Sequence, residues 1–123
     1  MTSYDTAIAR YFEAWNAPDA ETLAKAVAAA WTEDGSYTDP FTDVRGHEQL
    51  AAVIAGAHEQ FPGFEFRLIG AVDGHHDVVR FGWELVSPTD GSAPVAGFDV
   101  ARLAEDGRIS SVSGFLDRVP AGA

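Results

Sequence analysis

The sequence contains no cysteine, and its acidic residues outnumber its basic residues by 19 to 8, which gives a formal net charge of -11. The lack of cysteine excludes a disulfide framework, a thiolate nucleophile and a sulfur-ligated metal. The scarcity of lysine and arginine disfavours binding to nucleic-acid phosphates and to anionic membrane surfaces, because a negatively charged protein is repelled by both. We therefore expect neither nucleic acid nor a membrane among the partners of this chain.

Long apolar segments and cofactor motifs are also missing. No stretch has the length of a transmembrane helix, and the start of the chain lacks the basic flank and apolar run of a signal peptide, so we expect a cytoplasmic protein. No dinucleotide fingerprint, phosphate loop, nucleophile elbow or zinc-helix motif occurs, and we expect no cofactor. Because His47 and His58 are too far apart to share a metal, and His75 and His76 lie in a predicted turn, we expect no metal site either.

The first half of the chain has the 3.6-residue period of amphipathic helices. One apolar stripe from Tyr4 to Trp15 predicts a first helix. Pro18 interrupts the chain, and Asp19 can cap a second helix, which is rich in alanine. A third helix is predicted up to the Pro62-Gly63 stop. The apolar stripes of the second and third helices are Leu23, Val27 and Trp31, and Leu50, Val53, Ile54, Ala57 and Phe61.

The strands are predicted by a two-residue period and by turn sequences. Between the helices, Asp34-Gly35 ends the helical unit, residues 36–39 read as a short strand, and residues 41–46 read as a loop. After the third helix the hydrophobic residues alternate in four segments, and Asp106-Gly107 predicts a tight hairpin before the last of them. The four predicted strands cover residues 64–68, 79–85, 95–103 and 108–118.

Three helices followed by a meander of long strands predict an α+β fold, in which the helices gather on one side of an antiparallel sheet. No repeat, low-complexity tract or second domain is evident, so we expect residues 1–123 to form a single domain. The later strands carry apolar residues on both faces, as with Phe81 and Trp83 on one face and Val78 and Val86 on the other. We therefore expect a second copy of the chain to cover the outer face of the sheet in a homodimer.

Asp99 is the most unusual polar residue, because it lies in the middle of the apolar segment 95–103. An unpaired carboxylate is strongly disfavoured in such surroundings, so this group must be protonated, paired or at the end of a cavity. Two interpretations remain open: a functional acid in a pocket, or an ion pair with Arg80, Arg102 or Arg118.

Asp39 and Tyr37 form a second candidate pair. In an extended segment the two side chains point to the same side, which would place a phenol and a carboxylate at one rim. The alternative is that Asp39 only begins a turn with Pro40, as Asx-Pro pairs commonly do.

Tyr11 lies on the apolar stripe of the first helix, so its ring can be a simple core residue. Its hydroxyl still requires a partner once it is buried, and a protonated carboxyl or a ligand oxygen would serve. His58 follows Ala57 on the apolar edge of the third helix and could line a pocket.

Five short motifs are spread over the whole chain, each occurring once. Through them the chain resembles the nuclear transport factor 2-like superfamily, in particular its SnoaL-like polyketide cyclases and ketosteroid isomerases. This resemblance implies a curved, mixed sheet wrapped around helices into a cone with an apolar pocket, usually in a dimer. The motifs are Arg10-Tyr11-Phe12-Glu13-Ala14-Trp15-Asn16, Tyr37-Thr38-Asp39-Pro40, Gly46, Gly97-Phe98-Asp99-Val100 and Asp106-Gly107-Arg108-Ile109.

The resemblance to ketosteroid isomerases implies a role for three residues. Asp39 matches the general base of an Asp-Pro pair, Tyr11 matches a helix-one donor to the substrate oxygen, and Asp99 matches a strand aspartate held neutral as second donor. By this resemblance Asp39 removes a proton beside a carbonyl, while Tyr11 and Asp99 stabilise the enolate. All three side chains are then expected to line one cavity.

We therefore expect a cofactor-independent isomerase or cyclase that acts on a small apolar carbonyl compound. The alternatives are a non-catalytic ligand-binding protein and a pure dimerisation domain. Epoxide hydrolysis is disfavoured, because the related limonene epoxide hydrolase has an arginine where this chain has Gly97. The further residues that we expect to contact the substrate are Trp15, Tyr37, His58, Phe81, Trp83 and Phe115.

Overall fold

The structure, a computed structural model, describes residues 2–120 and contains three helices. Thr2 and Asp5 form a reciprocal capping box at the start of the first helix, and Asp19 caps the second by accepting a hydrogen bond from the Thr22 amide at 2.8 Å. Gly46 precedes the third with φ of 89°, a backbone conformation that favours glycine. The helices are α1 (Ser3–Trp15), α2 (Ala20–Ala30) and α3 (His47–Gln60).

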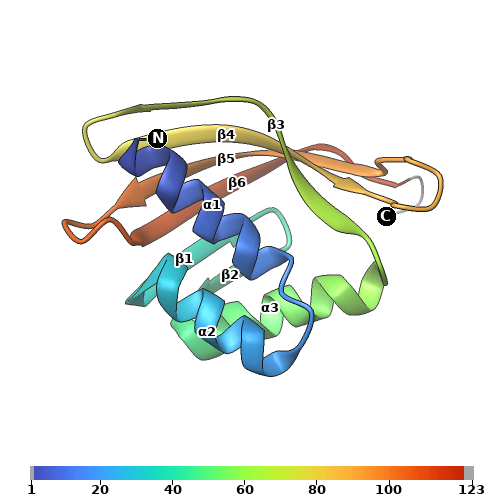
Figure 1. The fold of residues 1–123 in the computed structure, drawn as a ribbon, viewed down its shortest axis with the longest axis horizontal. Coiled ribbons are helices and arrows are strands. Elements are labelled where there is room, and N and C mark those ends of the chain that lie inside the picture. Colours follow the sequence, from blue (N-terminus) through green and yellow to red (C-terminus); the bar gives the residue numbers. More distant parts are fainter. Residues whose placement is uncertain (1, 121–123) are drawn as a thin grey trace.

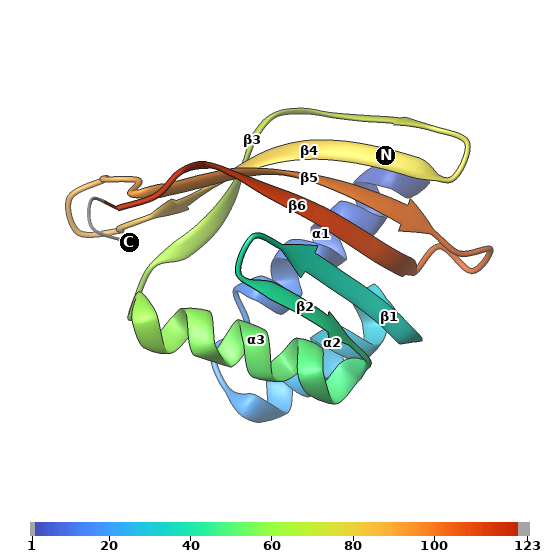
Figure 2. The same cartoon turned by 180° about the vertical axis from the view of Figure 1, so that it is seen from behind.

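Six strands form one curved sheet in the order β2-β1-β6-β5-β4-β3 (Figures 1 and 2). All neighbouring strands are antiparallel except β1 and β6, which are parallel. The predicted α+β class is thus confirmed, with a mixed rather than purely antiparallel sheet. The strands are β1 (Trp31–Asp39), β2 (Thr42–Arg45), β3 (Glu65–His75), β4 (Val78–Val86), β5 (Val95–Leu103) and β6 (Ile109–Arg118).

The boundary between α2 and β1 differs from the prediction. Trp31 was expected on the helical stripe, but it is the first residue of β1, is fully buried and pairs with Ile109 of β6. Asp34-Gly35 lies inside this strand instead of ending the helical unit. The predicted loop 41–46 contains β2, which pairs with β1. Strand pairing decided both cases: Trp31 pairs with the distant Ile109, and β2 pairs with β1 across the turn that joins them. Neither pairing is visible in a local hydrophobic period.

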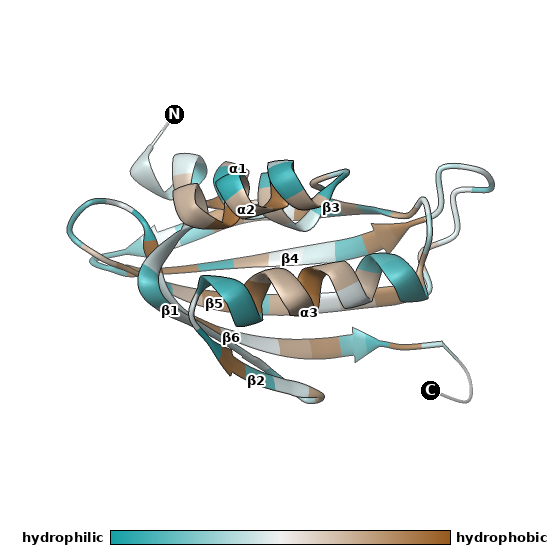
Figure 3. Ribbon diagram, turned by 90° about the horizontal axis from the view of Figure 1, so that it is seen from below, coloured by the Kyte–Doolittle hydropathy of each residue, from teal (hydrophilic) through white to brown (hydrophobic). Residues whose placement is uncertain are grey.

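The helices lie on the inner, concave side of the sheet, and the core fills the space between them (Figures 1 and 2). Apolar segments recur along α3 and along the strands (Figure 3). On β4 the inner positions Val79, Phe81, Trp83 and Leu85 are all buried. Within residues 2–120 no helix is long and apolar enough to cross a membrane.

Candidate active site

Two neighbouring cavities lie between the helices and the inner face of the sheet. The large cavity has a volume of about 390 Å³, and the small cavity has a volume of about 30 Å³. They share Phe66 and Trp83, whose rings are 5.6 Å apart and form the wall between them. The large cavity is lined by Asp39, Phe41, Ala57, Gln60, Phe61, Phe66, Trp83, Leu85, Val95, Leu116, Val119 and Pro120. The small cavity is lined by Tyr11, Phe12, Trp15, Tyr37, Phe66, Trp83 and Asp99.

Asp99 and Tyr11 meet at the small cavity. Strand β5 directs Asp99 to its inner face, where the side chain is only 1% exposed. Helix α1 brings Tyr11 to the same point, and the Tyr11 hydroxyl donates a hydrogen bond of 2.7 Å to Asp99 Oδ2. Tyr11 therefore has the buried polar partner that the sequence called for.

The ion-pair interpretation of Asp99 is wrong. Among residues 2–120, no lysine, arginine or histidine forms an ion pair with it. Asp99 is instead a buried acid that accepts a hydrogen bond from a neutral phenol, the Tyr11 side chain. The three arginines considered above form ion pairs with other acidic residues: Arg80 with Asp73, Arg102 with Asp77 and Arg118 with Glu84.

The surroundings of Asp99 shift its proton affinity. Burial raises the pKa of Asp99 to about 6, the hydrogen bond from Tyr11 and the nearby indole of Trp83 act to lower it, and the charge of Asp39 raises it. Burial and the charge of Asp99 raise the pKa of Tyr11 well above its ordinary value. Asp99 can therefore gain or lose a proton near neutral pH, whereas Tyr11 remains a neutral donor.

Asp39 lies in the adjacent large cavity and is held by two hydrogen bonds. The Tyr37 hydroxyl donates to Asp39 Oδ2 at 2.7 Å, and the Phe41 amide donates to Oδ1 at 2.9 Å. Both interpretations of the Asp-Pro pair are thus realised, since the carboxylate closes a turn and also faces a cavity. Tyr37 itself lines the small cavity, and burial is the main cause that raises its pKa.

The three principal residues do not line a single cavity, contrary to the expectation from the sequence. Tyr11 and Asp99 line the small cavity, and Asp39 lines the large one. The two carboxyl groups are still close, because a Cβ atom placed on Gly114 would lie 2.8 Å from Asp99 Oδ1 and 3.5 Å from Asp39 Cβ. A side chain at position 114 would occupy the space between them.

A second glycine, Gly97, supports the wall between the cavities. A Cβ atom on Gly97 would overlap the indole ring of Trp83, which lies across this part of β5. The arginine of epoxide hydrolases would therefore displace Trp83 here. The roles of Gly97 and Gly114 could not be read from the sequence, because each depends on a neighbouring strand.

Of the six further residues expected to contact the substrate, three line the cavities: Trp15, Tyr37 and Trp83. Phe81 lies behind Tyr11, with ring centres 5.2 Å apart, and lines neither cavity. His58 donates from Nε2 to the Trp15 carbonyl oxygen at 2.6 Å, so it supports the wall without lining it. Phe115 is 58% exposed on the outer face, since it has the opposite strand parity to the buried Gly114.

Asn16 and Phe66 form a link that the sequence analysis missed. The Asn16 side chain donates to the Phe66 carbonyl oxygen at 2.9 Å and accepts from the Phe66 amide at 2.8 Å. These two bonds join the end of α1 to the beginning of β3 and fix the position of one wall residue. Asparagine directly after the first helix was the available signal, but its partner is 50 residues away.

The chemistry available at this site is acid–base chemistry in an apolar setting. Apart from backbone groups, Asp39 and Gln60 supply the polar groups of the large cavity, and aromatic and aliphatic side chains supply the rest. In the described part of the chain, no cluster of three histidine, aspartate or glutamate residues is arranged to hold a metal ion. One carboxylate thus faces the apolar space, and a second, buried acid lies behind the aromatic wall.

Comparison with known proteins gives a consistent result. Residues 8–112 match the family model of the SnoaL-like domain. A candidate isomerase of the SnoaL-like family from Agrobacterium tumefaciens is 43% identical, with a TM-score of 0.88 over 95% of this chain and 99% of that chain. A candidate SnoaL-like polyketide cyclase from Jannaschia is 23% identical, with a TM-score of 0.76 over 94% of this chain and 85% of that chain. No curated protein sequence gives a significant match.

Proposed function

Because this chain belongs to the SnoaL-like domain family, we propose that it is a cofactor-independent isomerase or cyclase that moves a proton beside the carbonyl group of a small apolar substrate. The observation that carries this proposal is the position of Asp39, whose carboxylate faces an apolar cavity of about 390 Å³. A cavity of this size lies in the usual range for small-molecule sites. The substrate class follows from the lining, which offers one base and few other polar side chains.

Asp39 is the general base in this proposal. Its carboxylate is oriented by Tyr37 and by the Phe41 amide, so its position is fixed before the substrate binds. It takes a proton from the carbon next to the carbonyl, and the electron pair of that C–H bond moves toward the carbonyl oxygen to form an enolate. Return of the proton to another carbon completes an isomerisation. In a cyclisation the enolate attacks a second carbonyl of the same substrate, and the proton returns to the alkoxide that forms.

The small cavity is the place where the enolate oxygen is stabilised. It is too small for the body of a substrate, but it adjoins the large cavity at Phe66 and Trp83. A substrate carbonyl that lies against this wall points toward Asp99 and the Tyr11 hydroxyl bonded to it. Hydrogen-bond donors held ready in a dry site stabilise developing negative charge far better than water does.

The test is deuterium exchange into enones and β-keto esters in D₂O, followed by NMR for the wild-type protein and for Asp39→Asn. We expect exchange above the buffer background, reduced by a factor of about 10²–10⁴ in the variant with ligand binding retained. Asp43→Asn is the matched control, since this exposed aspartate lies on the same β1–β2 hairpin and lines neither cavity. Binding without exchange by the wild-type protein would instead favour a non-catalytic ligand-binding protein.

We also propose that two copies associate through the outer face of the sheet. Ile69 and Phe115 are 41% and 58% exposed on this face, and Phe98 is half-buried directly opposite Phe115 on the neighbouring strand. Exposed apolar residues of this size on the open face of a sheet are typical of an interface. A second copy presents the same surface and so can bury it symmetrically.

A further inference from the structure

Three polar atoms around the small cavity have no hydrogen-bond partner within the described residues. They are Asp99 Oδ1, Trp15 Nε1 and Trp83 Nε1. The three residues are at most 7% exposed, and all of them line the cavity. A buried polar group left without a partner is destabilising, so three of them in one place call for a common explanation.

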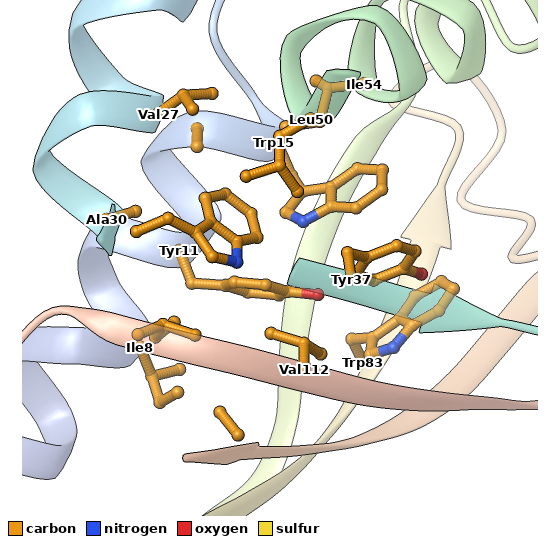
Figure 4. Packing of buried hydrophobic residues seen from close by; sticks show 14 of the residues in the cluster. Ile8, Tyr11, Trp15, Val27, Ala30, Tyr37, Leu50, Ile54, Trp83 and Val112 are labelled. Carbon is orange, nitrogen blue, oxygen red and sulfur yellow. The ribbon is translucent and has the colours of Figure 1, made fainter. Parts of the chain in front are cut away.

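The two indoles approach the Asp99–Tyr11 pair from different elements. Trp83 comes from β4, and its N–H lies near enough to Asp99 to lower the pKa of that acid, although the two groups form no aligned hydrogen bond. Trp15 comes from α1 and has the same effect on Tyr11. Figure 4 shows Tyr11, Trp15, Tyr37 and Trp83 gathered around this part of the core.

We infer that the small cavity is a binding site for a single oxygen atom, with the indole N–H groups of Trp15 and Trp83 as its donors. The cavity volume of about 30 Å³ exceeds the roughly 10–15 Å³ that one water molecule requires and excludes a carbon ring. A water molecule has two lone pairs and two O–H groups, which is the complement that two indole N–H groups and one carboxylate oxygen require. Water is therefore the occupant of the free protein.

A ligand carbonyl takes the place of this water when a substrate fills the large cavity. The binding of a carbonyl at this site rests on the proposed function, whereas the binding of water does not. In the resembling isomerases the phenol and the acid contact the substrate oxygen directly. Here the Tyr11 hydroxyl already donates to Asp99, which leaves the indoles as the free donors.

Exchange of water for a carbonyl also changes the protonation of Asp99. A carbonyl oxygen only accepts hydrogen bonds, so Asp99 Oδ1 stays satisfied only if Asp99 takes up a proton and becomes a donor itself. The titratable groups that face Asp99 are Tyr11 from α1 and Tyr37 and Asp39 from β1, and none of these is a cation. Ligand binding is therefore accompanied by uptake of a proton wherever Asp99 is ionised in the free protein.

The first experiment uses the fact that the chain has three tryptophans, which give three indole N–H signals in a ¹⁵N-labelled protein. Trp→Phe variants assign them. We expect the signals of Trp15 and Trp83 to show NOE contacts with a long-lived water molecule. Trp31 is the control, because its Nε1 is equally buried and unpartnered but does not line the cavity. Absence of water contacts at Trp15 and Trp83 overturns the inference.

The second experiment adds 2-cyclohexen-1-one to the labelled protein at pH 5 and pH 7. We expect the Trp15 and Trp83 signals to shift, their water contacts to disappear and the affinity to be about tenfold lower at pH 7, since the fraction of protonated Asp99 falls by about that factor around a pKa of about 6. Asp99→Asn should remove the pH dependence. If the ketone binds but the Trp15 and Trp83 signals and their water contacts stay unchanged, replacement of the water by a carbonyl is refuted and the water site stands. Deuterium exchange tests the proposed function separately.

Discussion

Gly114 lies directly opposite Asp99 in the β5–β6 pairing, and the space where its side chain would stand is bounded by the Asp99 carboxylate. A Cβ atom there would be 2.8 Å from Asp99 Oδ1 and 3.4 Å from the Thr38 carbonyl oxygen. The first distance is shorter than any ordinary van der Waals contact, and the second is at the lower limit of one. This glycine is therefore required for Asp99 to reach Tyr11.

The first prediction concerns Gly114→Ala. Overpacking of this kind costs about 1–3 kcal/mol of unfolding free energy, and the displaced carboxylate should lose its hydrogen bond to Tyr11. Urea unfolding measures the first effect. Gly56→Ala is the control, since Gly56 lies on the exposed side of α3 with no atom near its missing Cβ, and it should gain about 0.5–1 kcal/mol. A Gly114→Ala protein as stable as wild type would contradict the close approach of the Asp99 carboxylate to this position.

The second prediction concerns the pH dependence of stability. Asp99 has a pKa of about 6 in the folded protein and an ordinary value near 4 when unfolded, so the folded state binds more protons between these values. The free energy of unfolding should therefore fall as the pH rises from about 4 to above 6, and this residue should contribute about 3 kcal/mol to the fall.

Asp99→Asn isolates this contribution, because asparagine can still accept the hydrogen bond from Tyr11 but does not titrate. Several exposed aspartates, among them Asp77 and Asp106, have lowered pKa values and act in the opposite direction, but they are present in both proteins. The difference in unfolding free energy between wild type and variant, measured by urea at pH 4 to 8, should follow the titration of Asp99 alone. Parallel curves would show that Asp99 has an ordinary pKa.

The third prediction concerns the proposed dimer. Phe115→Lys places a charge in the middle of the outer face and should convert the dimer to a monomer at micromolar concentration, as measured by sedimentation velocity. Leu68→Lys is the matched control, because Leu68 is 42% exposed but pairs with Trp83 on the opposite face of the sheet. A wild-type protein that sediments as a monomer at micromolar concentration would contradict the proposed dimer.

Much of the fold could be predicted because its signals are local. Helix periods, the Asp19 cap and the Asp106-Gly107 turn all depend on residues within one element, and the structure has these features where they were expected. The predictions failed where pairing between strands decides the structure. Trp31 lies in β1 because it pairs with Ile109 of β6 and packs in the core, and residues 42–45 form β2 because they pair with β1.

The candidate site was predictable residue by residue but not as an arrangement. Strand parity correctly placed Tyr37 and Asp39 on one side, and their side chains are hydrogen-bonded. The division into two cavities could not be predicted, because it depends on the contact of Phe66 with Trp83 across neighbouring strands. Phe115 was expected to contact the substrate, but its parity directs it to the outer face.

The link between Asn16 and Phe66 has a consequence for changing what this protein accepts. Asn16 holds position 66 through the backbone amide and carbonyl, so the anchoring does not depend on which side chain stands there. The ring of Phe66 can therefore be exchanged for smaller groups while the strand stays in place. Position 66 is thus a natural starting point for directed evolution, since its side chain forms one half of the wall between the two cavities.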